Sequence, residues 1–197
     1  MRYIDEVRRK TIHLSSALIP AIYAFISTEL ALAILTPLLA AALLLDLLRL
    51  RSAQVRSWVD RRMGNLFRRE ESRRLSGATY VLLAGVLSIW LFPKRVAIVA
   101  LFIMSVSDTL ASLIGRRYGR TPLLGKSLEG SAAHFASGVV VGILSLPAHP
   151  LAAVLGALTA TLVEALPLSI GRHHVDDNLA VPLTCGAVMT LLIQDGL

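Results

Sequence analysis

An aspartate lies within one of the most apolar stretches of the chain. It belongs to the segment VALFIMSVSDTLASLIG, and spacings of three or four residues place a polar stripe on one helix face: Ser105, Asp108, Ser112 and Gly115. An ionisable group inside a membrane span is costly and marks a functional site by default. The carboxylate of Asp108 could hold a magnesium ion or orient a hydroxyl group for attack. The alternative is an aspartate that only bonds a neighbouring helix, and we favour function.

The loop after this segment is rich in glycine and basic residues. Residues 115–131 read GRRYGRTPLLGKSLEGS, with three glycines before Lys126 and one after it. Glycine lets the backbone approach a phosphate, arginine and lysine neutralise its charge, and a helix that begins at Ser131 adds anion affinity. Gly119 and residues 125–127 nearly form a P-loop, but the glycines are too far apart and no strand precedes them. The loop predicts a phosphate site without a P-loop fold.

Two further groups of acidic residues lie in the second half of the chain. Glu164 follows Thr161 by one turn in an apolar stretch, and it would either join the site or pair with an arginine. Asp176, Asp177 and Asn178 precede the last apolar stretch, where such residues are common helix N-caps. Oxygen-bearing side chains beside a basic loop also suit magnesium, which prefers oxygen ligands and bound phosphate. The sequence leaves both interpretations open for each group.

Histidines give weaker signals. His13 follows Arg9 and Lys10 near the start of the first apolar stretch, where it would contact phosphate or relay a proton; the residues alone do not decide. Less weight falls on the other four histidines, which are His134, His149, His173 and His174. The adjacent pair lacks the cysteine or the spaced histidine of a zinc site, and we interpret it as interfacial.

Membrane helices must position these residues. Of the 197 residues, 55% are hydrophobic and only 17% are charged, and mean hydropathy is +0.66. The apolar residues form blocks, several of which reach the roughly 17–25 residues that cross a bilayer. We identify seven spans, at 12–27, 29–50, 75–92, 94–114, 131–147, 151–170 and 179–193. The predicted fold is all-α, a polytopic integral membrane helical bundle forming a single domain over 1–197.

The basic residues predict an orientation. The net charge is +7, and arginine and lysine gather in four segments on one side of the spans, at 1–11, 51–74, 115–130 and 171–178. This asymmetry predicts a cytoplasmic N-terminus, cytoplasmic site loops and an external C-terminus. We interpret the first span as a membrane helix rather than a signal peptide, because its lead contains acidic residues and no clean cleavage site follows. Anionic lipid or phosphate explains the charge better than nucleic acid does.

The basic segment 51–74 differs from the other loops. Apolar residues recur in it at helical spacing, at Val55, Trp58, Val59, Met63, Leu66 and Phe67. This pattern favours an amphipathic helix on the cytoplasmic membrane surface over a solvated basic linker. Nearby, Asp46 and Arg49 have the spacing of an i,i+3 pair. The single cysteine, Cys185, lies in an apolar run and is expected to pack in the core.

Four pieces of the chain together resemble a known family. They are RRKTIHLSSALIP, RLSGATYVLLAGV, SDTLASLIGRRYGRTPLLGKSLEGS and DDNLAVPL, and they extend over nearly the whole sequence. The chain resembles the CTP-dependent lipid kinases, which comprise dolichol kinase, phytol kinase and the yeast-type diacylglycerol kinase and are related to phosphatidate cytidylyltransferase. The resemblance implies a nucleotide and metal site that contains Asp108, Gly115, Gly119, Lys126, Glu129, Gly130, Arg9, Lys10, Asp176, Asp177 and Asn178. Relatives often have glycine where this chain has Ser107.

The resemblance implies transfer of the terminal phosphoryl group of CTP to a membrane alcohol. The acceptor would be a polyprenol- or dolichol-like isoprenoid alcohol, or a diacylglycerol-like lipid. We expect catalytic roles for Asp108, Lys126 and Glu129, with Mg²⁺ held by Asp108, Asp176 and Asp177. The expected nucleotide-binding residues are Arg9, Lys10, His13, Gly115, Arg116, Arg117, Gly119, Lys126, Ser127, Gly130, Ser131 and Asn178.

Two other activities compete with this prediction. A cytidylyltransferase would use the same nucleotide, but a lipid phosphate would attack the α-phosphorus and give a CDP-lipid and pyrophosphate. A small transporter or flippase would line a pathway with its intramembrane carboxylates. The charge gathers at one face, whereas a pathway needs polar groups across the membrane, so we disfavour the transporter. The sequence names no particular alcohol, and it leaves a homodimer open.

Overall fold

The computed structural model describes residues 3–63, 74–166, 169–170 and 173–194. Helices make up nearly all of it: α1 (Tyr3–Leu14), η1 (Ser15–Ala17), α2 (Leu18–Tyr23), α3 (Thr28–Arg51), α4 (Ala53–Met63), α5 (Gly77–Leu91), α6 (Lys94–Phe102), η3 (Ile103–Ser107), α7 (Asp108–Tyr118), α8 (Leu128–Ser145), α9 (Pro150–Ala165) and α10 (Asp177–Gln194). Two antiparallel hairpins pair β1 (Pro122–Leu123) with β2 (Lys126–Ser127), and β3 (Ser169–Ile170) with β4 (His173–His174). The all-α membrane prediction is confirmed.

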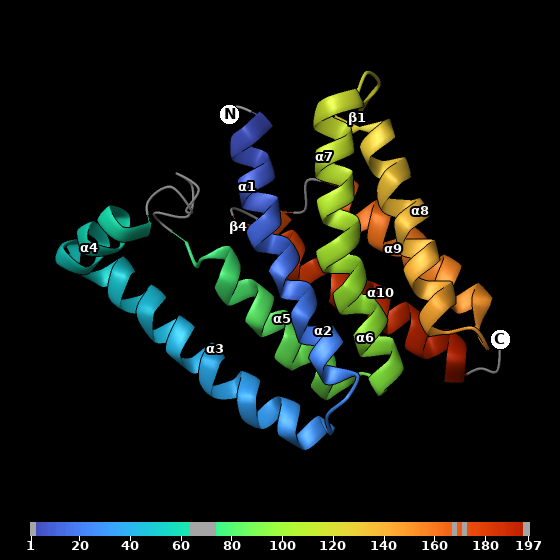
Figure 1. The fold of residues 1–197 in the computed structure, drawn as a ribbon, viewed down its shortest axis with the longest axis horizontal. Coiled ribbons are helices and arrows are strands. Elements are labelled where there is room, and N and C mark those ends of the chain that lie inside the picture. Colours follow the sequence, from blue (N-terminus) through green and yellow to red (C-terminus); the bar gives the residue numbers. More distant parts are fainter. Residues whose placement is uncertain (1–2, 64–73, 167–168, 171–172, 195–197) are drawn as a thin grey trace.

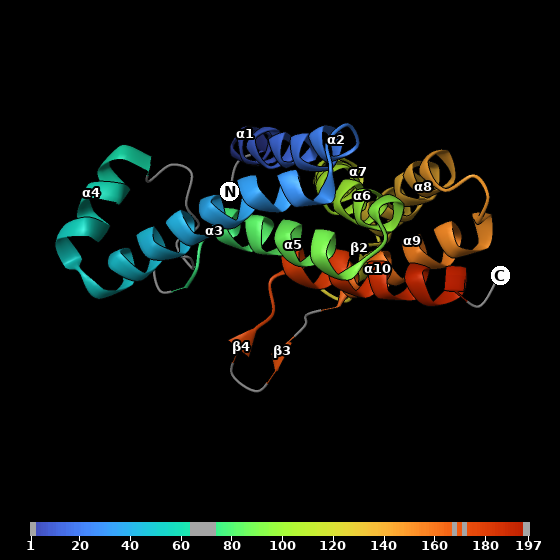
Figure 2. The ribbon, with the colours of Figure 1, turned by 90° about the horizontal axis from the view of Figure 1, so that it is seen from below.

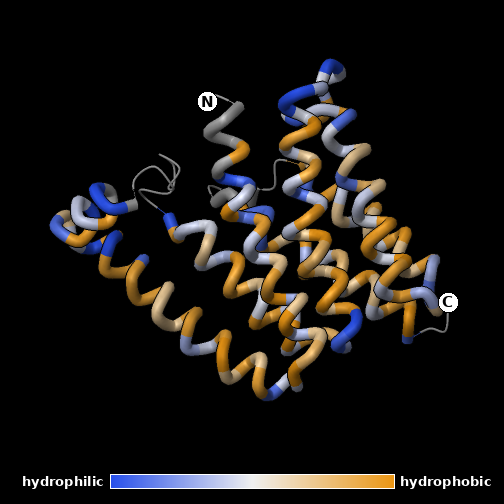
Figure 3. Tube along the Cα trace, viewed as in Figure 1, coloured by the Kyte–Doolittle hydropathy of each residue, from blue (hydrophilic) through white to orange (hydrophobic). Residues whose placement is uncertain are grey.

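Four helices within the described ranges are long and apolar enough to cross a membrane. They are Thr28–Arg51, Lys94–Tyr118, Leu128–Ser145 and Asp177–Gln194, and they match four of the seven predicted spans. The helices Gly77–Leu91 and Pro150–Ala165 are apolar but shorter. Hydrophilic residues gather along α4 and at the connection between α7 and α8, and the helices between are mostly hydrophobic (Figure 3).

The prediction of a single first span over 12–27 was wrong. The chain instead forms α1, the short 3₁₀ turn η1 and α2. The hydroxyl groups of Ser15 and Ser16 donate to the carbonyls of Ile12 and His13, each at 2.6 Å, and so compete with the helical backbone bonds. Pro20 lacks an N–H and removes another of these bonds.

Other boundaries also differ from the prediction. α7 continues to Tyr118 and α8 begins at Leu128, so the connection between them is shorter than the predicted loop 115–130. A serine side chain caps the start of α8, because Ser127 Oγ accepts the N–H of Gly130 at 3.2 Å. α9 ends at Ala165, before the predicted 170, because Leu166 precedes a proline and has an extended backbone.

The predicted amphipathic segment 51–74 forms a helix over part of its length. α4 covers Ala53–Met63, and residues 64–73, which include Leu66 and Phe67, lie outside the described residues. Val59 is fully buried, whereas Trp58 is half exposed with the guanidinium of Arg62 5.8 Å from its ring. The described part is therefore two-faced, and its place on the membrane surface stays a prediction.

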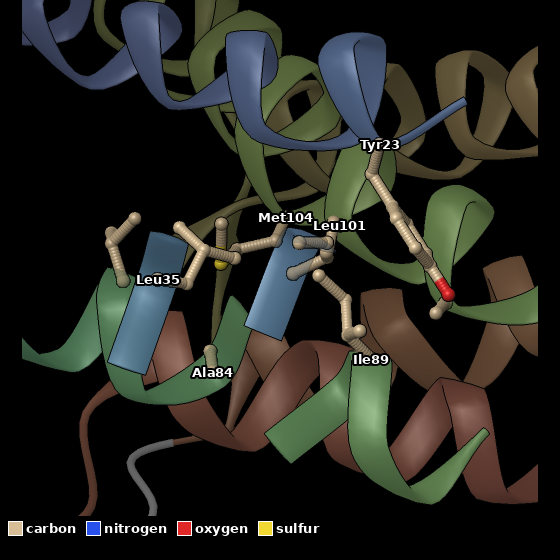
Figure 4. Close-up of a cluster of buried hydrophobic side chains, with 9 residues drawn as sticks. Tyr23, Leu35, Ala84, Ile89, Leu101 and Met104 are labelled. Atoms are coloured by element: carbon tan, nitrogen blue, oxygen red, sulfur yellow. The ribbon is translucent and has the colours of Figure 1, made fainter. Parts of the chain in front are cut away.

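The continuous rod formed by α6, η3 and α7 lies at the centre of the bundle. α1 and α2 pack on one side of it, and α5, α8 and α10 pack on others (Figures 1 and 2). This rod is 56% buried over its apolar window, against 22% for α3. The apolar core beside it contains Tyr23, Leu35, Ala84, Ile89, Leu101 and Met104, which point toward one another (Figure 4). A second cluster contains Cys185, so its predicted core position is confirmed.

A buried charge network joins the end of α3 to the start of α5. Arg49 Nη2 donates to Asp46 Oδ1 at 3.0 Å, which confirms the predicted i,i+3 pair. The other oxygen of Asp46 accepts the N–H of Ser76 and the hydroxyl of Thr79, both at 2.7 Å. Arg49 Nη2 also donates to the carbonyl of Arg74 at 2.7 Å. These bonds hold the end of α3 against the start of α5.

We expect Asp46→Asn to lower the free energy of unfolding by roughly 3–5 kcal/mol, because it removes the negative charge from the buried carboxylate that Arg49 contacts. Thermal unfolding of the detergent-solubilised protein measures the change. The exposed Arg51→Gln at the end of the same helix serves as a matched control and should cost far less. Equal melting temperatures of the two variants would contradict a structural role for the network.

Candidate functional site

A cavity of about 490 Å³ opens between α1, α7 and α8, the C-terminal end of α9 and the N-terminal end of α10. Thirteen of the residues predicted from the sequence line it: Arg9, Lys10, His13, Asp108, Gly115, Arg116, Lys126, Ser127, Gly130, Ser131, Asp176, Asp177 and Asn178. The lining also includes Ala111, Ser112, Gly125 and Glu164. Side chains that are up to 169 positions apart in sequence thus meet in one place, as Arg9 and Asn178 do.

The carboxylate of Asp108 lies between two basic side chains of α1. Lys10 and His13 are one turn apart, and Lys10 Nζ bonds Asp108 Oδ2 while His13 Nε2 lies 3.2 Å from the same oxygen. His13 Nε2 is also 3.2 Å from the carbonyl of Met104. Both neighbours of Nε2 are acceptors, so this nitrogen carries a proton. The polar helix α1 is therefore tied to the apolar central rod through Asp108.

A π-helical turn sets the position of Asp108. η3 spans Ile103–Ser107 and ends where Asp108 begins α7. Such turns insert an extra residue into a helix, rotate the residues that follow, and are frequent at functional sites. The hydroxyls of Ser16 and Ser105 lie 2.8 Å apart and join η1 to η3 beside it.

Lys126 forms a second charged centre. The β1–β2 hairpin turns through Leu124 and Gly125, which have φ of 49° and 93°, and presents Lys126 to the cavity. Lys126 Nζ bonds Glu164 Oε1 and lies 3.3 Å from Asp177 Oδ2. Burial acts to lower the pKa of Lys126, but the carboxylates of Asp177 and Glu164 outweigh it and raise the pKa above its ordinary value. The ammonium therefore stays charged, as a phosphate-binding group must.

The glycines of the loop have different roles from those expected. A Cβ on Gly130 would lie 2.9 Å from the carbonyl oxygen of Ala111, and one on Gly115 would lie 2.8 Å from Ser127 Oγ. These glycines let α7 and α8 pack closely at the cavity. A Cβ on Gly125 would meet nothing within 4 Å, and this residue lines the cavity. Gly125 is the glycine whose backbone is open to a phosphate.

Three predicted residues do not line the cavity: Arg117, Gly119 and Glu129. Glu129 is half-buried, and its Oε1 accepts the N–H of Thr121 at 3.1 Å, so the side chain closes the loop. The catalytic role expected for Glu129 came from the resemblance to the lipid kinases. The Arg117 guanidinium lies 5.5 Å from the Tyr118 ring, and a Cβ on Gly119 would lie 2.2 Å from the carbonyl oxygen of Gly115.

Sequence reasoning left Glu164 undecided, and the structure places it in the cavity. Glu164 belongs to α9, and only 4% of its surface is exposed. The sequence signal that could have placed Glu164 in the site was its position in an apolar helix, because a buried carboxylate needs a cationic partner. Lys126, the lysine of the predicted phosphate loop, was a candidate for that partner. His134, a weak candidate from the sequence, lies one turn beyond Ser131 on α8, and its Nδ1 forms a hydrogen bond with Thr161 Oγ1.

The expected magnesium ligands lie in the cavity but are bonded to protein groups. Asp108 and Asp177 contact lysines, and Asp176 Oδ1 accepts the N–H of Asn178 at 3.0 Å. No preformed cluster of three or more acidic, histidine or cysteine side chains occurs in the described part of the chain. Magnesium commonly takes one or two carboxylates and completes its shell with phosphate and water, so this donor set fits it.

Comparison with known proteins finds several relatives. The uncharacterized protein RP860 of Rickettsia prowazekii is 30% identical, over 91% of this chain and 90% of that protein. CTP-dependent diacylglycerol kinase 1 of Saccharomyces cerevisiae is 29% identical, over 96% of this chain and 74% of that protein. A probable chloroplastic phytol kinase of Triticum aestivum is 38% identical over 57% of this chain and 41% of its own length. No protein-family model matches the chain, and no solved structure matches it significantly.

We expect Glu164→Gln to lower the pKa of Lys126, because one of the carboxylates that raise it becomes neutral. The chain has three lysines, Lys10, Lys94 and Lys126, so the side-chain carbon resonances of labelled lysine can be followed through a pH titration. Glu29→Gln, an exposed change in the first turn of α3, is the control and should leave that titration in place. An unchanged Lys126 titration in Glu164→Gln would disprove the electrostatic pairing.

Proposed function

The chain belongs to the family of CTP-dependent lipid kinases, and from that premise we propose that it transfers the terminal phosphoryl group of CTP to an isoprenoid alcohol in the membrane. The observation that carries the proposal is a cavity in which two lysines, two arginines and several carboxylates converge beside apolar helices. A nucleotide and a lipid can meet there, because the cavity is polar and the surrounding helix surfaces are hydrophobic.

The acceptor is the open part of the proposal. The named relatives comprise kinases of phytol, which is an isoprenoid alcohol, and kinases of diacylglycerol. We propose a polyprenol- or dolichol-like alcohol first and a diacylglycerol-like lipid second. Both present a hydroxyl group at the polar end of long apolar chains, which the exposed leucines and isoleucines of the helices can contact.

We propose that nucleotide binding exchanges the partners of the charged side chains. In the free protein Lys10 is held by Asp108, and Lys126 is held by Glu164 and Asp177. Phosphate oxygens compete with the carboxylates for both lysines, because a phosphate group carries more negative charge than a carboxylate does. The exchange frees the carboxylates to bind a cation or a hydroxyl group.

In the transfer itself, a bond forms between the acceptor oxygen and the terminal phosphorus, and the bond from that phosphorus to the bridging oxygen breaks, so that CDP leaves. The proton of the acceptor hydroxyl group passes to a carboxylate of the cavity. Lys126 and Arg116, which both line the cavity, offset charge on the phosphate oxygens. Asp108 and Asp177, with Asp176 beside them, would hold Mg²⁺. When bound, Mg²⁺ would neutralise negative charge on the phosphate groups. Catalysis of this kind depends mainly on positioning and electrostatics.

The side of the membrane is a further part of the proposal. The cavity lies at the end of the bundle that carries the basic residues of α1, of α4 and of the connection between α7 and α8 (Figures 1 and 3). The excess of arginine and lysine in these segments supports a cytoplasmic cavity that takes CTP from the cytosol.

Incubation of the purified protein with labelled CTP and a panel of lipid alcohols should give a lipid monophosphate and CDP. The panel contains a polyprenol, dolichol, phytol and diacylglycerol, and each is tested with CTP and with ATP. Pyrophosphate together with a CDP-lipid, formed from a lipid phosphate, would identify a cytidylyltransferase instead. No phosphorylated lipid from any combination would refute the proposal.

Asp108→Asn and Lys126→Met should each lower turnover by roughly 10²–10³-fold or more, because each removes a charge that faces the transferred group. Glu129→Gln tests the catalytic role that the sequence predicted for this residue against its position in the structure. This carboxylate lies outside the cavity, so we expect turnover to fall less than about tenfold. Initial rates with the best acceptor, together with the melting temperature of each variant, check this ranking. A larger loss for Glu129→Gln than for Asp108→Asn would reverse the assignment.

A further inference from the structure

Four buried polar atoms beneath the cavity have no hydrogen-bond partner within the described ranges. They are Ser107 Oγ, Ser131 Oγ, His134 Nε2 and Glu164 Oε2. The exposed fractions of their residues are 0, 6, 0 and 4%. A buried polar group without a partner costs free energy, and four in one region are more than chance packing explains.

The four atoms belong to three elements, η3, α8 and α9, that meet along one face of α8. Ser131, His134 and Gly138 recur along one face of α8. A Cβ on Gly138 would lie 3.7 Å from Ser107 Oγ, so this face of α8 meets η3. The same Cβ would lie 3.1 Å from that of Ala157, so the face also meets α9, which carries Glu164.

The polar atoms form an upper level, which borders the cavity, and a lower level, to which His134 and Ser107, beside Gly138, belong. Ser131 and Glu164 line the cavity and form its floor. His134 lies one turn below Ser131 and reaches across to Thr161, which lies one turn below Glu164. The lower level is fully enclosed, whereas the upper level borders the cavity.

The tautomer of His134 follows from its partner. Thr161 Oγ1 donates its only proton to the carbonyl of Ala157 at 2.8 Å. It can therefore only accept from His134 Nδ1, 3.0 Å away. Nδ1 carries the proton, and Nε2 presents a lone pair that needs a donor. Glu164 Oε2 is likewise an acceptor, since Lys126 occupies the other oxygen.

The two serines are exceptional among the helical hydroxyl groups. Eight others in the described ranges donate to the carbonyl four residues earlier: Thr11, Ser105, Thr109, Ser137, Thr159, Thr161, Thr184 and Thr190. Ser107 and Ser131 do not, and their protons stay available. Two acceptors and two hydroxyl groups are complementary to an O–H group, which both donates and accepts.

We propose that Ser107, Ser131, His134 and Glu164 form a hydroxyl-binding pocket under the cavity floor. Its ligand is an O–H group, from a water molecule or from the acceptor alcohol. The alcohol as the source rests on the proposed function, and water does not. For the alcohol, Ser131 Oγ and Glu164 Oε2 hold the hydroxyl group at the floor, next to Lys126 and the phosphate that it binds.

Alanine variants distinguish a pocket that binds an O–H group from buried polar groups that have no hydrogen-bond partner. If an O–H group is bound, Ser107→Ala and Ser131→Ala each remove one of its partners and lower the melting temperature of the substrate-free protein by about 2–4 °C. Ser88→Ala is the matched control, because Ser88 Oγ is also buried without a partner in the described structure but belongs to α5, outside the pocket. The control should keep or raise the melting temperature. Ser131→Thr restores the hydroxyl group and should recover part of the loss.

Kinetics with the same variants identify the source. If the alcohol occupies the pocket, Ser131→Ala raises KM for the alcohol about tenfold, a larger factor than any change in CTP affinity measured by calorimetry. If water occupies it, the melting temperature falls and this KM does not change. Pocket variants that match Ser88→Ala in both melting temperature and KM would overturn the proposal. If the wild type phosphorylates no alcohol, the proposed function fails while the melting temperatures still decide whether the pocket binds water.

Discussion

The bond network around Asp108 is the interaction on which the rest of the structure depends. A carboxylate within an apolar rod is stable only where its charge is neutralised, and Lys10 and His13 provide this from α1. α1 is too polar to be held by apolar contacts alone, so the same interaction fixes the helix that forms one wall of the cavity. Charge neutralisation and site assembly are therefore one event in this fold.

Small residues make the opposite wall possible. A Cβ on Gly142 would lie 2.9 Å from that of Ala153, and a Cβ on Gly138 would be nearly as close to Ala157. Close backbone approach in a membrane gives many weak contacts without large side chains. It also leaves room on the α8 face for Ser131 and His134, so that polar groups sit inside an otherwise apolar bundle.

The sequence predicts much of this arrangement because its strongest signals are local. The lengths of the apolar blocks predicted the long helices, and the position of Asp108 among aliphatic residues indicated a functional site. The failures depend on contacts between distant elements. Glu129 turns toward Thr121 only because α8 begins at Leu128, and Glu164 joins the site only because the hairpin carries Lys126 to it. Periodicity does not encode either contact, nor the π-helical turn that orients Asp108.

The length of α9 has a consequence for the surrounding lipid. Its 16 residues span about 24 Å, less than the roughly 30 Å of a typical hydrocarbon layer. Such a mismatch is relieved by local thinning of the bilayer next to the short helix. Since Glu164 is on α9, the thinning would bring the headgroup plane of neighbouring lipids down toward the cavity floor. A lipid would then present its polar end to the site with little vertical displacement, and the shape of the membrane would become part of substrate delivery.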